Sequence, residues 1–114
     1  GKVAAQGEWL KGQLKEMAKR YPVIGHVRGL GMMIGIEIVK PHEAADHMGC
    51  FPGDGELSAL IQKKCFEAGL ILERGGRNGI VLRLLPSLLI SDEELKIFLD
   101  KFEQALLAAG VRPA

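Results

Sequence analysis

The sequence predicts an α+β domain with the element order α-β-β-α-β-β-α, in which helices cover one face of a small, mostly antiparallel sheet. Three stretches have the apolar spacing of amphipathic helices, and the segments between them are short apolar or alternating runs bounded by glycine-rich turns. A chain of 114 residues can bury a single core, so we expect one domain over residues 1–114.

The first helix is expected over residues 3–20. Apolar side chains recur there at the three-, four- and seven-residue spacing that places them on one helix face: Val3, Leu10, Leu14, Met17 and Tyr21. Pro22 follows and cannot continue a helix, so the helix should end before it.

The next segment, "HVRGLGMMIGIEIV", predicts a β-hairpin. A short strand around residues 26–28 and a longer strand over residues 32–39 flank a glycine-rich turn. In the second strand Ile34, Ile36 and Ile38 share one face, which we expect in the core. The other face would carry the remaining residues of the strand: Met33, Gly35, Glu37 and Val39.

A long loop and a second helix follow the hairpin. Residues 40–55 hold two prolines, three glycines and many polar side chains, which is typical of a loop. Asp54 is a suitable N-cap for a helix that runs to Ala68, and Gly69 is placed to end it. The buried face of this helix is expected to carry Leu57, Leu60, Ile61 and Cys65.

Two more strands and a last helix complete the chain. The strands are expected at residues 70–73 and 80–85, joined by "RGGRNG", because Asn-Gly favours the positive backbone angles of tight hairpins. "SDEE" then matches a capping box between Ser91 and Glu94, and Gly110 should end the helix. The buried stripe of this helix is expected to be Leu95, Phe98, Leu99, Phe102 and Leu106.

Composition and charge exclude several classes of function. The 15 basic and 14 acidic residues are spread without blocks, so we expect no nucleic-acid partner. No stretch approaches the ~20 apolar residues of a membrane span, and no signal peptide is visible. Cys50 and Cys65 match no disulfide, metal or redox pattern, which favours a reducing, cytoplasmic setting. The chain begins without Met and enters helical periodicity at once, which predicts that it is a piece of a longer protein.

The long loop contains four residues of types that bind metals: His42, Asp46, His47 and Cys50. Their spacing fits no standard zinc pattern. Such residues arise readily in a polar loop, so we expect no metal site.

The glycines at positions 25, 29, 31 and 35 invite comparison with a nucleotide-binding loop. The G-x-G-x-x-G/A spacing fails because Ile34 stands where the last small residue belongs. The segment also precedes a strand, whereas a phosphate loop precedes a helix. We expect these glycines to serve a turn and close backbone packing.

No side chain stands out as a nucleophile or an acid–base group. Cys65 lies on a helix face that should be buried. Glu37 and Glu73 are expected to be surface or hydrogen-bonded structural residues. The serines considered as nucleophiles lack the G-x-S-x-G elbow: Ser58, Ser87 and Ser91.

Arg83 is the single charge in the most apolar run of the chain, residues 80–90. Alternation places it with Val81 and Leu85, on the face opposite Leu82 and its neighbours. A guanidinium cannot shed its charge, so the side chain either reaches water along apolar neighbours or meets an anion. Two interpretations are therefore open: a half-exposed surface residue, and a clamp for a carboxylate that uses the planar fork on a rigid strand.

Two stretches of the sequence match blocks of a known family. The stretch "VRGLGMMIGIEIV" is similar to a hairpin of that family. The stretch "GLILERGGRNGIVLRLLPSLLISDEEL" is similar to the family's closing block, which consists of a strand, an Arg, "PPL" and a helix-capping Ser or Thr. In both, the chain resembles the C-terminal small domain of class III (ornithine/4-aminobutyrate type) aminotransferases, which are pyridoxal-phosphate (PLP) enzymes of fold type I. "DGELSALIQKKCFEAGL" and "ERGGRNG" resemble the branch that uses 2,4-diaminobutyrate and 2-oxoglutarate.

The resemblance covers essentially the whole chain and implies where its site residues lie. Residues 3–20 would link it to a large PLP-binding domain of the same chain. Arg83 takes the position of the family Arg that binds the α-carboxylate of 2-oxoglutarate or glutamate. Ser87 departs from the second Pro of "PPL". The Schiff-base lysine, the Asp that pairs with the pyridine nitrogen and the phosphate-binding residues would all belong to the large domain, so this chain should hold no catalytic or cofactor-binding residue.

The resemblance implies an intact, homodimeric enzyme that moves an amino group from 2,4-diaminobutyrate through PLP to 2-oxoglutarate. Its ligands would be small amino and keto acids, and the 114-residue chain alone should be inactive and hold no PLP. A rival interpretation is a stand-alone α+β module that senses a small carboxylate through Arg83. A third, an interaction domain without a ligand, requires Arg83 to be exposed and unpaired.

Overall fold

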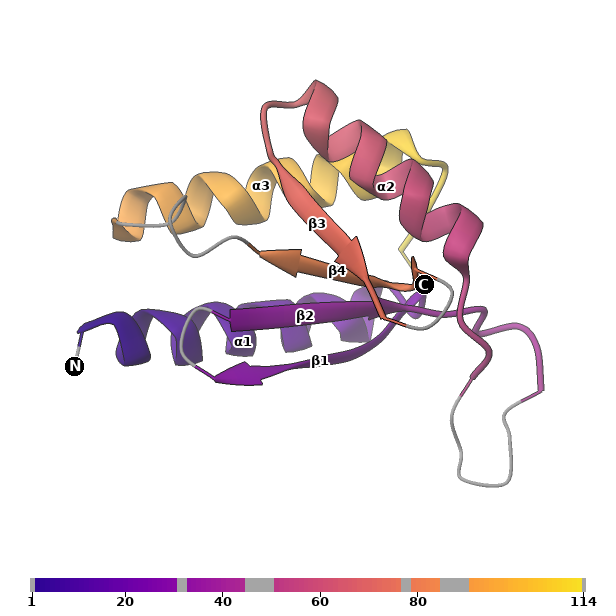
Figure 1. The fold of residues 1–114 in the computed structure, drawn as a ribbon, viewed down its shortest axis with the longest axis horizontal. Coiled ribbons are helices and arrows are strands. Elements are labelled where there is room, and N and C mark those ends of the chain that lie inside the picture. Colours follow the sequence, from indigo (N-terminus) through magenta and orange to yellow (C-terminus); the bar gives the residue numbers. More distant parts are fainter. Residues whose placement is uncertain (1, 31–32, 45–50, 77–78, 85–90, 114) are drawn as a thin grey trace.

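A computed structural model of the chain describes residues 2–30, 33–44, 51–76, 79–84 and 91–113. Its elements follow the predicted order: α1 Lys2–Arg20, β1 Ile24–Leu30, β2 Met33–Ile38, α2 Gly55–Glu67, β3 Leu72–Gly75, β4 Val81–Leu84 and α3 Asp92–Ala108. The strands form one sheet in the order β1-β2-β4-β3, and every neighbouring pair is antiparallel (Figure 1). The predicted α+β class and element order are confirmed.

The core lies between one face of the sheet and the helices. The sheet contributes alternate residues such as Ile36 and Leu82, both fully buried, and these pack in one cluster with Leu14, Ile61 and Phe102 from the three helices. Figure 1 shows β2 in front of α1, and β3 in front of α3. One face of the sheet is therefore covered by helices, and among the described residues no helix covers the other, open face.

Helix α1 buries the stripe that the spacing predicts. Leu10, Leu14 and Met17 are buried, as is Tyr21 directly after the helix, whose N–H donates to the Met17 carbonyl. Lys19 and Arg20 lie in the last turn, where cations stabilise the helix dipole. The side chain of Val3 lies outside the described part.

The first hairpin is longer on its β1 side than predicted. Cross-strand pairing runs from Ile24 opposite Ile38 to Leu30 opposite Met33. The predicted strand at residues 26–28 was too short. β1 lies at the edge of the sheet, and its sequence lacks the regular apolar alternation by which a half-buried strand is predicted. Ile34, Ile36 and Ile38 are buried as expected.

Helix α2 is capped as predicted, and the long loop before it is closed at its ends. The Asp54 carboxylate accepts a 2.9 Å hydrogen bond from the Leu57 N–H. At the other end the chain turns at Gly69, whose φ is +92°. Val39 and Gly53 form an isolated antiparallel bridge, so the segment between them begins and ends at the sheet.

The bounds predicted for the second pair of strands were shifted. β3 covers Leu72–Gly75, where residues 70–73 were predicted, and the described part of the next strand is Val81–Leu84. The Gly79 N–H donates to the Gly76 carbonyl, and Gly76 and Gly79 have φ of +75° and +67°. The turn is thus shorter than the predicted six residues, and Glu73 faces Arg83 across the hairpin.

The last helix begins at its predicted cap. The Glu94 N–H donates to the Ser91 hydroxyl, which in turn donates to the Glu94 carboxylate. Leu95, Phe98 and Phe102 are buried, with Ala105 and Leu106, whereas Leu99 is only partly buried. The chain leaves the helix at Gly110, which has a φ of +92°.

Candidate functional site

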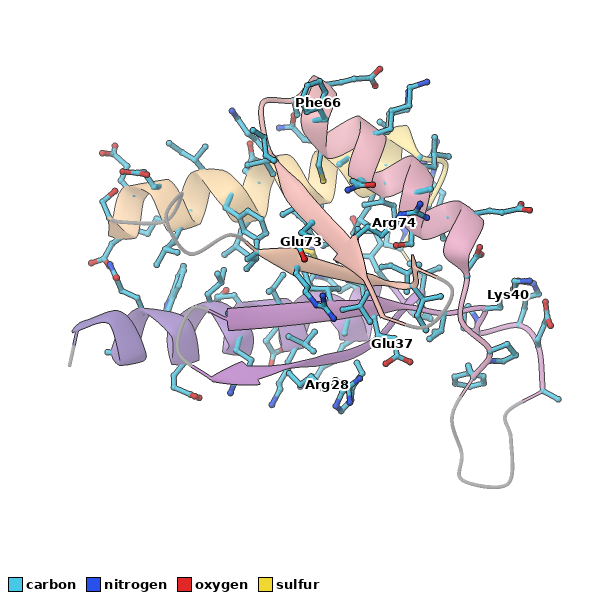
Figure 2. All side chains as sticks on the ribbon, viewed as in Figure 1. Arg28, Glu37, Lys40, Phe66, Glu73 and Arg74 are labelled. Carbon is cyan, nitrogen blue, oxygen red and sulfur yellow. The ribbon has the colours of Figure 1, made fainter. Side chains whose placement is uncertain are left out.

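The open face of the sheet carries a row of four paired residues, one from each strand. Arg28 lies opposite Gly35, Gly35 opposite Arg83, and Arg83 opposite Glu73. Directly paired residues of an antiparallel sheet point to the same face. Figure 2 shows Arg28 and Glu73 on the strands in front of the helices. The row therefore places two guanidinium groups on the exposed surface of the sheet.

Arg83 lies where strand alternation predicts. Leu82 and Leu84 are buried on the core side, whereas Val81 is half-buried and Arg83 exposed on the opposite side. The side chain of Arg83 is 49% exposed, and its Nη1 is 3.5 Å from Oε1 of Glu73. Arg83 is thus exposed but paired, which departs from the unpaired arginine that an interaction domain without a ligand would need.

A second ion pair lies on the same face. Nη2 of Arg28 is 3.5 Å from Oε2 of Glu37, whose side chain is 24% exposed. Arg28 belongs to the edge strand β1 and is 66% exposed, whereas Arg83 belongs to the inner strand β4. An inner strand is fixed by hydrogen bonds on both sides, so Arg83 is the better-positioned cation of the two.

Two of the four nucleophile candidates, Cys65 and Ser91, have structural roles. Cys65 is fully buried, and burial raises the pKa of its thiol to about 12. The Ser91 hydroxyl caps α3. The Ser58 hydroxyl is buried and has no hydrogen-bond partner among the described residues, and Ser87 lies outside the described part. Cys65 is therefore an inert core residue, as expected from its helix face.

Only one of the four loop residues considered as metal ligands can be placed. His42 is 77% exposed, and its Nε2 is 4.0 Å from Glu43. Asp46, His47 and Cys50 lie outside the described residues. Within the described ranges, no group of three or more His, Cys, Asp or Glu side chains is close enough to hold a metal ion.

Three of the four glycines considered for a phosphate loop lie on strands. Gly25 and Gly29 belong to β1 and Gly35 to β2, and Gly31 lies outside the described part.

None of the described helices is both long enough and apolar enough to cross a membrane.

The lysines whose burial is described are exposed at positions 15, 19, 63 and 96 and half-buried at positions 11, 40, 64 and 101. Four of them contact a nearby glutamate: Lys11, Lys19, Lys40 and Lys64. Two surface pockets, of about 390 and 260 Å³, include Lys96 and Lys63, and both of these side chains are exposed. The side chain of Lys11 is 16% exposed, and its Nζ donates to the Glu8 carboxylate and to the Gly29 carbonyl, so this amine is engaged within the chain.

Comparison with known proteins places this α+β fold among the aminotransferases. An aminotransferase structure from Bacillus anthracis superposes with a TM-score of 0.77 at 33% identity, over 93% of this chain and 23% of that one. The family model described as Aminotransferase class-III matches residues 1–106. The chain belongs to the class III aminotransferase family.

Two curated relatives are similar over almost the whole chain. A diaminobutyrate–2-oxoglutarate aminotransferase of Haemophilus influenzae is 46% identical over 104 residues, which are 91% of this chain and 23% of the relative. An enzyme of the same name from Rhizobium meliloti is 45% identical over 111 residues, which are 97% and 23%. The chain therefore spans about a quarter of the length of these relatives.

Proposed function

We propose that this chain is the C-terminal small domain of a PLP-dependent enzyme that transfers an amino group from 2,4-diaminobutyrate to 2-oxoglutarate. The family match and the similarity to two diaminobutyrate–2-oxoglutarate aminotransferases support the activity. Within that enzyme, Arg83 binds the α-carboxylate of 2-oxoglutarate and of the glutamate formed from it. Without the large domain, the chain is inactive.

The observation that carries the role of Arg83 is its place on the open face of the sheet. Its strand β4 has a partner on either side, and its neighbours Leu82 and Leu84 anchor the strand in the core. The guanidinium of Arg83 therefore projects from a fixed backbone toward whatever covers this face. A planar fork of N–H donors fits the two oxygens of a carboxylate.

Docking against the large domain strengthens this contact. In the isolated chain the side chain of Arg83 is 49% exposed, and water screens its charge. When a large domain covers the sheet, water is displaced and the attraction between guanidinium and carboxylate increases. The small domain thereby orients the keto acid for the reaction.

The cofactor belongs to the remainder of the enzyme. PLP supplies an electron sink when bound. Four of the described lysines are held in ion pairs with glutamates, and in the proposed enzyme the large domain supplies the Schiff-base lysine. The proposed enzyme is a cytoplasmic homodimer, a setting consistent with the free, buried thiol of Cys65.

The experiment is a steady-state comparison of Arg83→Ala and Arg28→Ala in the full-length enzyme. A hydrogen-bonded charge contact is worth about 1.5 to 3 kcal/mol, so Arg83→Ala should raise the KM for 2-oxoglutarate roughly 10- to 100-fold. Arg28→Ala removes a guanidinium from the same sheet face and should leave this KM within about twofold.

An unchanged KM and kcat in Arg83→Ala would return Arg83 to a surface role and exclude the proposed contact. The stand-alone carboxylate sensor makes a different prediction. In that case the 114-residue chain alone would bind 2-oxoglutarate in a calorimetric titration, and Arg83→Ala would abolish the binding.

A further inference from the structure

Two glycines lie beside Arg83 on the open face of the sheet, one on each neighbouring strand. On β3, a Cβ atom added to Gly75 would be 2.5 Å from Nη1 of Arg83 and 2.9 Å from its Cζ. The guanidinium therefore already fills the space that a side chain at Gly75 would take. On β2, Gly35 is directly paired with Arg83.

The space over Gly35 is open. Its neighbours Ile34 and Ile36 are buried, so a side chain at position 35 would point to the open face. Apart from its chain neighbours, the only described atom within 4 Å of a Cβ added there is Cγ1 of Val81, at 3.1 Å. The side of Arg83 that faces β2 thus has a gap next to it, and the floor of this gap is the backbone of Gly35.

The gap lies between two cations. Arg28 and Arg83 stand on either side of Gly35, two strand spacings or about 10 Å apart at the backbone. Arg28 is in contact with Glu37, so Arg83 is the cation that can supply hydrogen bonds to a ligand in the gap. β2 pairs with a strand on each side, so Gly35 supplies room and no hydrogen-bond donor.

We propose that the carboxylate held by Arg83 lies over Gly35, and that the missing side chain at position 35 admits the keto acid to the guanidinium. The inference rests on the proposed function of Arg83 and adds a specificity-determining residue to it. A carboxylate needs two adjacent N–H groups of the planar fork for a bidentate contact. The size of residue 35 therefore sets the affinity of the enzyme for carboxylates at this position.

The first test is a size series, Gly35→Ala and Gly35→Val, in the full-length enzyme. Gly35 lies in a strand and has no positive φ, so its backbone accepts either side chain. The KM for 2-oxoglutarate should rise from wild type to Gly35→Ala to Gly35→Val. Gly35→Val blocks a hydrogen-bonded charge contact, so its KM should be about 10- to 100-fold above that of wild type. The Kd of glutarate, a dicarboxylate that cannot react, should rise in the same order in a calorimetric titration.

The second test separates the blocked gap from a shift of β4. The methyl group of Gly35→Ala would meet Val81, two residues from Arg83 on the same strand. Val81→Ala removes that contact. If the gap receives the carboxylate, Gly35→Ala/Val81→Ala should bind glutarate as weakly as Gly35→Ala does. Recovery of the wild-type Kd in the double variant would instead attribute the loss to displacement of Val81 and overturn the proposal.

His26→Val is the matched control, because it introduces the same side chain on the same sheet face. His26 is exposed on β1 and is paired with Glu37, away from Arg83. It should leave the Kd of glutarate within about twofold, as expected for a surface substitution. In an Arg83→Ala background, Gly35→Val should have no further effect on that Kd.

The outcomes separate this inference from the proposed function. If Arg83→Ala weakens the binding of 2-oxoglutarate but Gly35→Val leaves the Kd of glutarate unchanged, the position over Gly35 is refuted and the carboxylate contact stands. If Arg83→Ala has no effect, the contact itself fails. Equal effects of Gly35→Val and His26→Val would attribute the change to a general disturbance of the sheet face and overturn the proposal.

Discussion

The phenol of Tyr21 donates a 2.6 Å hydrogen bond to Oε2 of Glu103, which joins the end of α1 to α3. Nη1 of Arg20 contacts the same oxygen at 3.1 Å, and the guanidinium carbon of Arg20 lies 5.7 Å from the centre of the Tyr21 ring. Tyr21 is buried. One carboxylate therefore receives two donors from the residues where α1 ends, and the two helices are tied together at this point.

Tyr21→Phe should lower the free energy of unfolding by about 1 to 2 kcal/mol, because it removes a hydrogen bond to a charged group and keeps the buried ring. Urea denaturation of the 114-residue chain measures the change. Glu103→Gln keeps an acceptor for the phenol and should cost less. A Tyr21→Phe chain as stable as the wild type would show that water replaces this bond without loss.

Alkaline pH should weaken the contribution of Cys65 to stability. Burial raises the pKa of its thiol from 9.0 to about 12 in the folded chain. Between these values the unfolded chain loses the thiol proton while the folded chain keeps it, so stability falls as pH rises above 9. Cys65→Ala cannot ionise, so the difference in unfolding free energy between wild type and variant should narrow from pH 8 to pH 10. A difference that stays constant over this range would contradict the raised pKa.

Two serine-to-alanine changes should have different effects. Ser91 accepts the Glu94 N–H as the cap of α3, and Ser91→Ala should cost about 1 kcal/mol. The hydroxyl of Ser58 is buried without a partner among the described residues. Ser58→Ala should therefore be neutral or stabilising, since it removes a desolvated polar group. Thermal unfolding of both variants checks the order, and a larger loss at Ser58 would reveal a partner for its hydroxyl.

Two glycine-to-alanine changes should move stability in opposite directions. Gly110 has a φ of +92° with open space around it. Gly110→Ala should therefore lower the free energy of unfolding by about 1 to 2 kcal/mol, through backbone strain alone. Gly12 lies inside α1, also with open space, and Gly12→Ala should stabilise the chain by roughly 0.5 to 1 kcal/mol. Urea denaturation of both variants tests the pair, and a stabilising Gly110→Ala would exclude the left-handed backbone there.

Local patterns in the sequence were sufficient for most of the fold. The caps Asp54 and Ser91, and the alternation around Ile36, depend on neighbours within a few residues, and the structure confirms each. The pairing between strands depends on where a turn begins. With three glycines in "RGGRNG", the sequence allowed more than one turn. The predicted bounds differ from those of β3 by two residues at each end and from the start of β4 by one residue.

This uncertainty in the turn also hid a part of the candidate site. The face of Arg83 followed from alternation alone, and the structure bears it out. Glu73 was predicted as a surface residue at the end of a strand, because the longer predicted turn did not place it opposite Arg83. When the turn lies at Gly76 and Gly79, Gly75 pairs with Val81. Two residues further from the turn on each strand, Glu73 then pairs with Arg83. The sequence therefore contains the residues that pair Glu73 with Arg83, but their pairing can be predicted only when the register of the two strands is known.

The closure of the long loop has a consequence for how far its length can be changed. The Lys40 N–H donates to the Pro52 carbonyl at 2.8 Å, and the Asp54 N–H donates to the Ile38 carbonyl at 2.9 Å. These bonds fix the two ends independently of the number of residues between them. Each doubling of such a loop costs only ~0.6 kcal/mol of closure entropy. Insertions or deletions between these two ends should therefore cost little and leave the sheet that carries Arg83 in place.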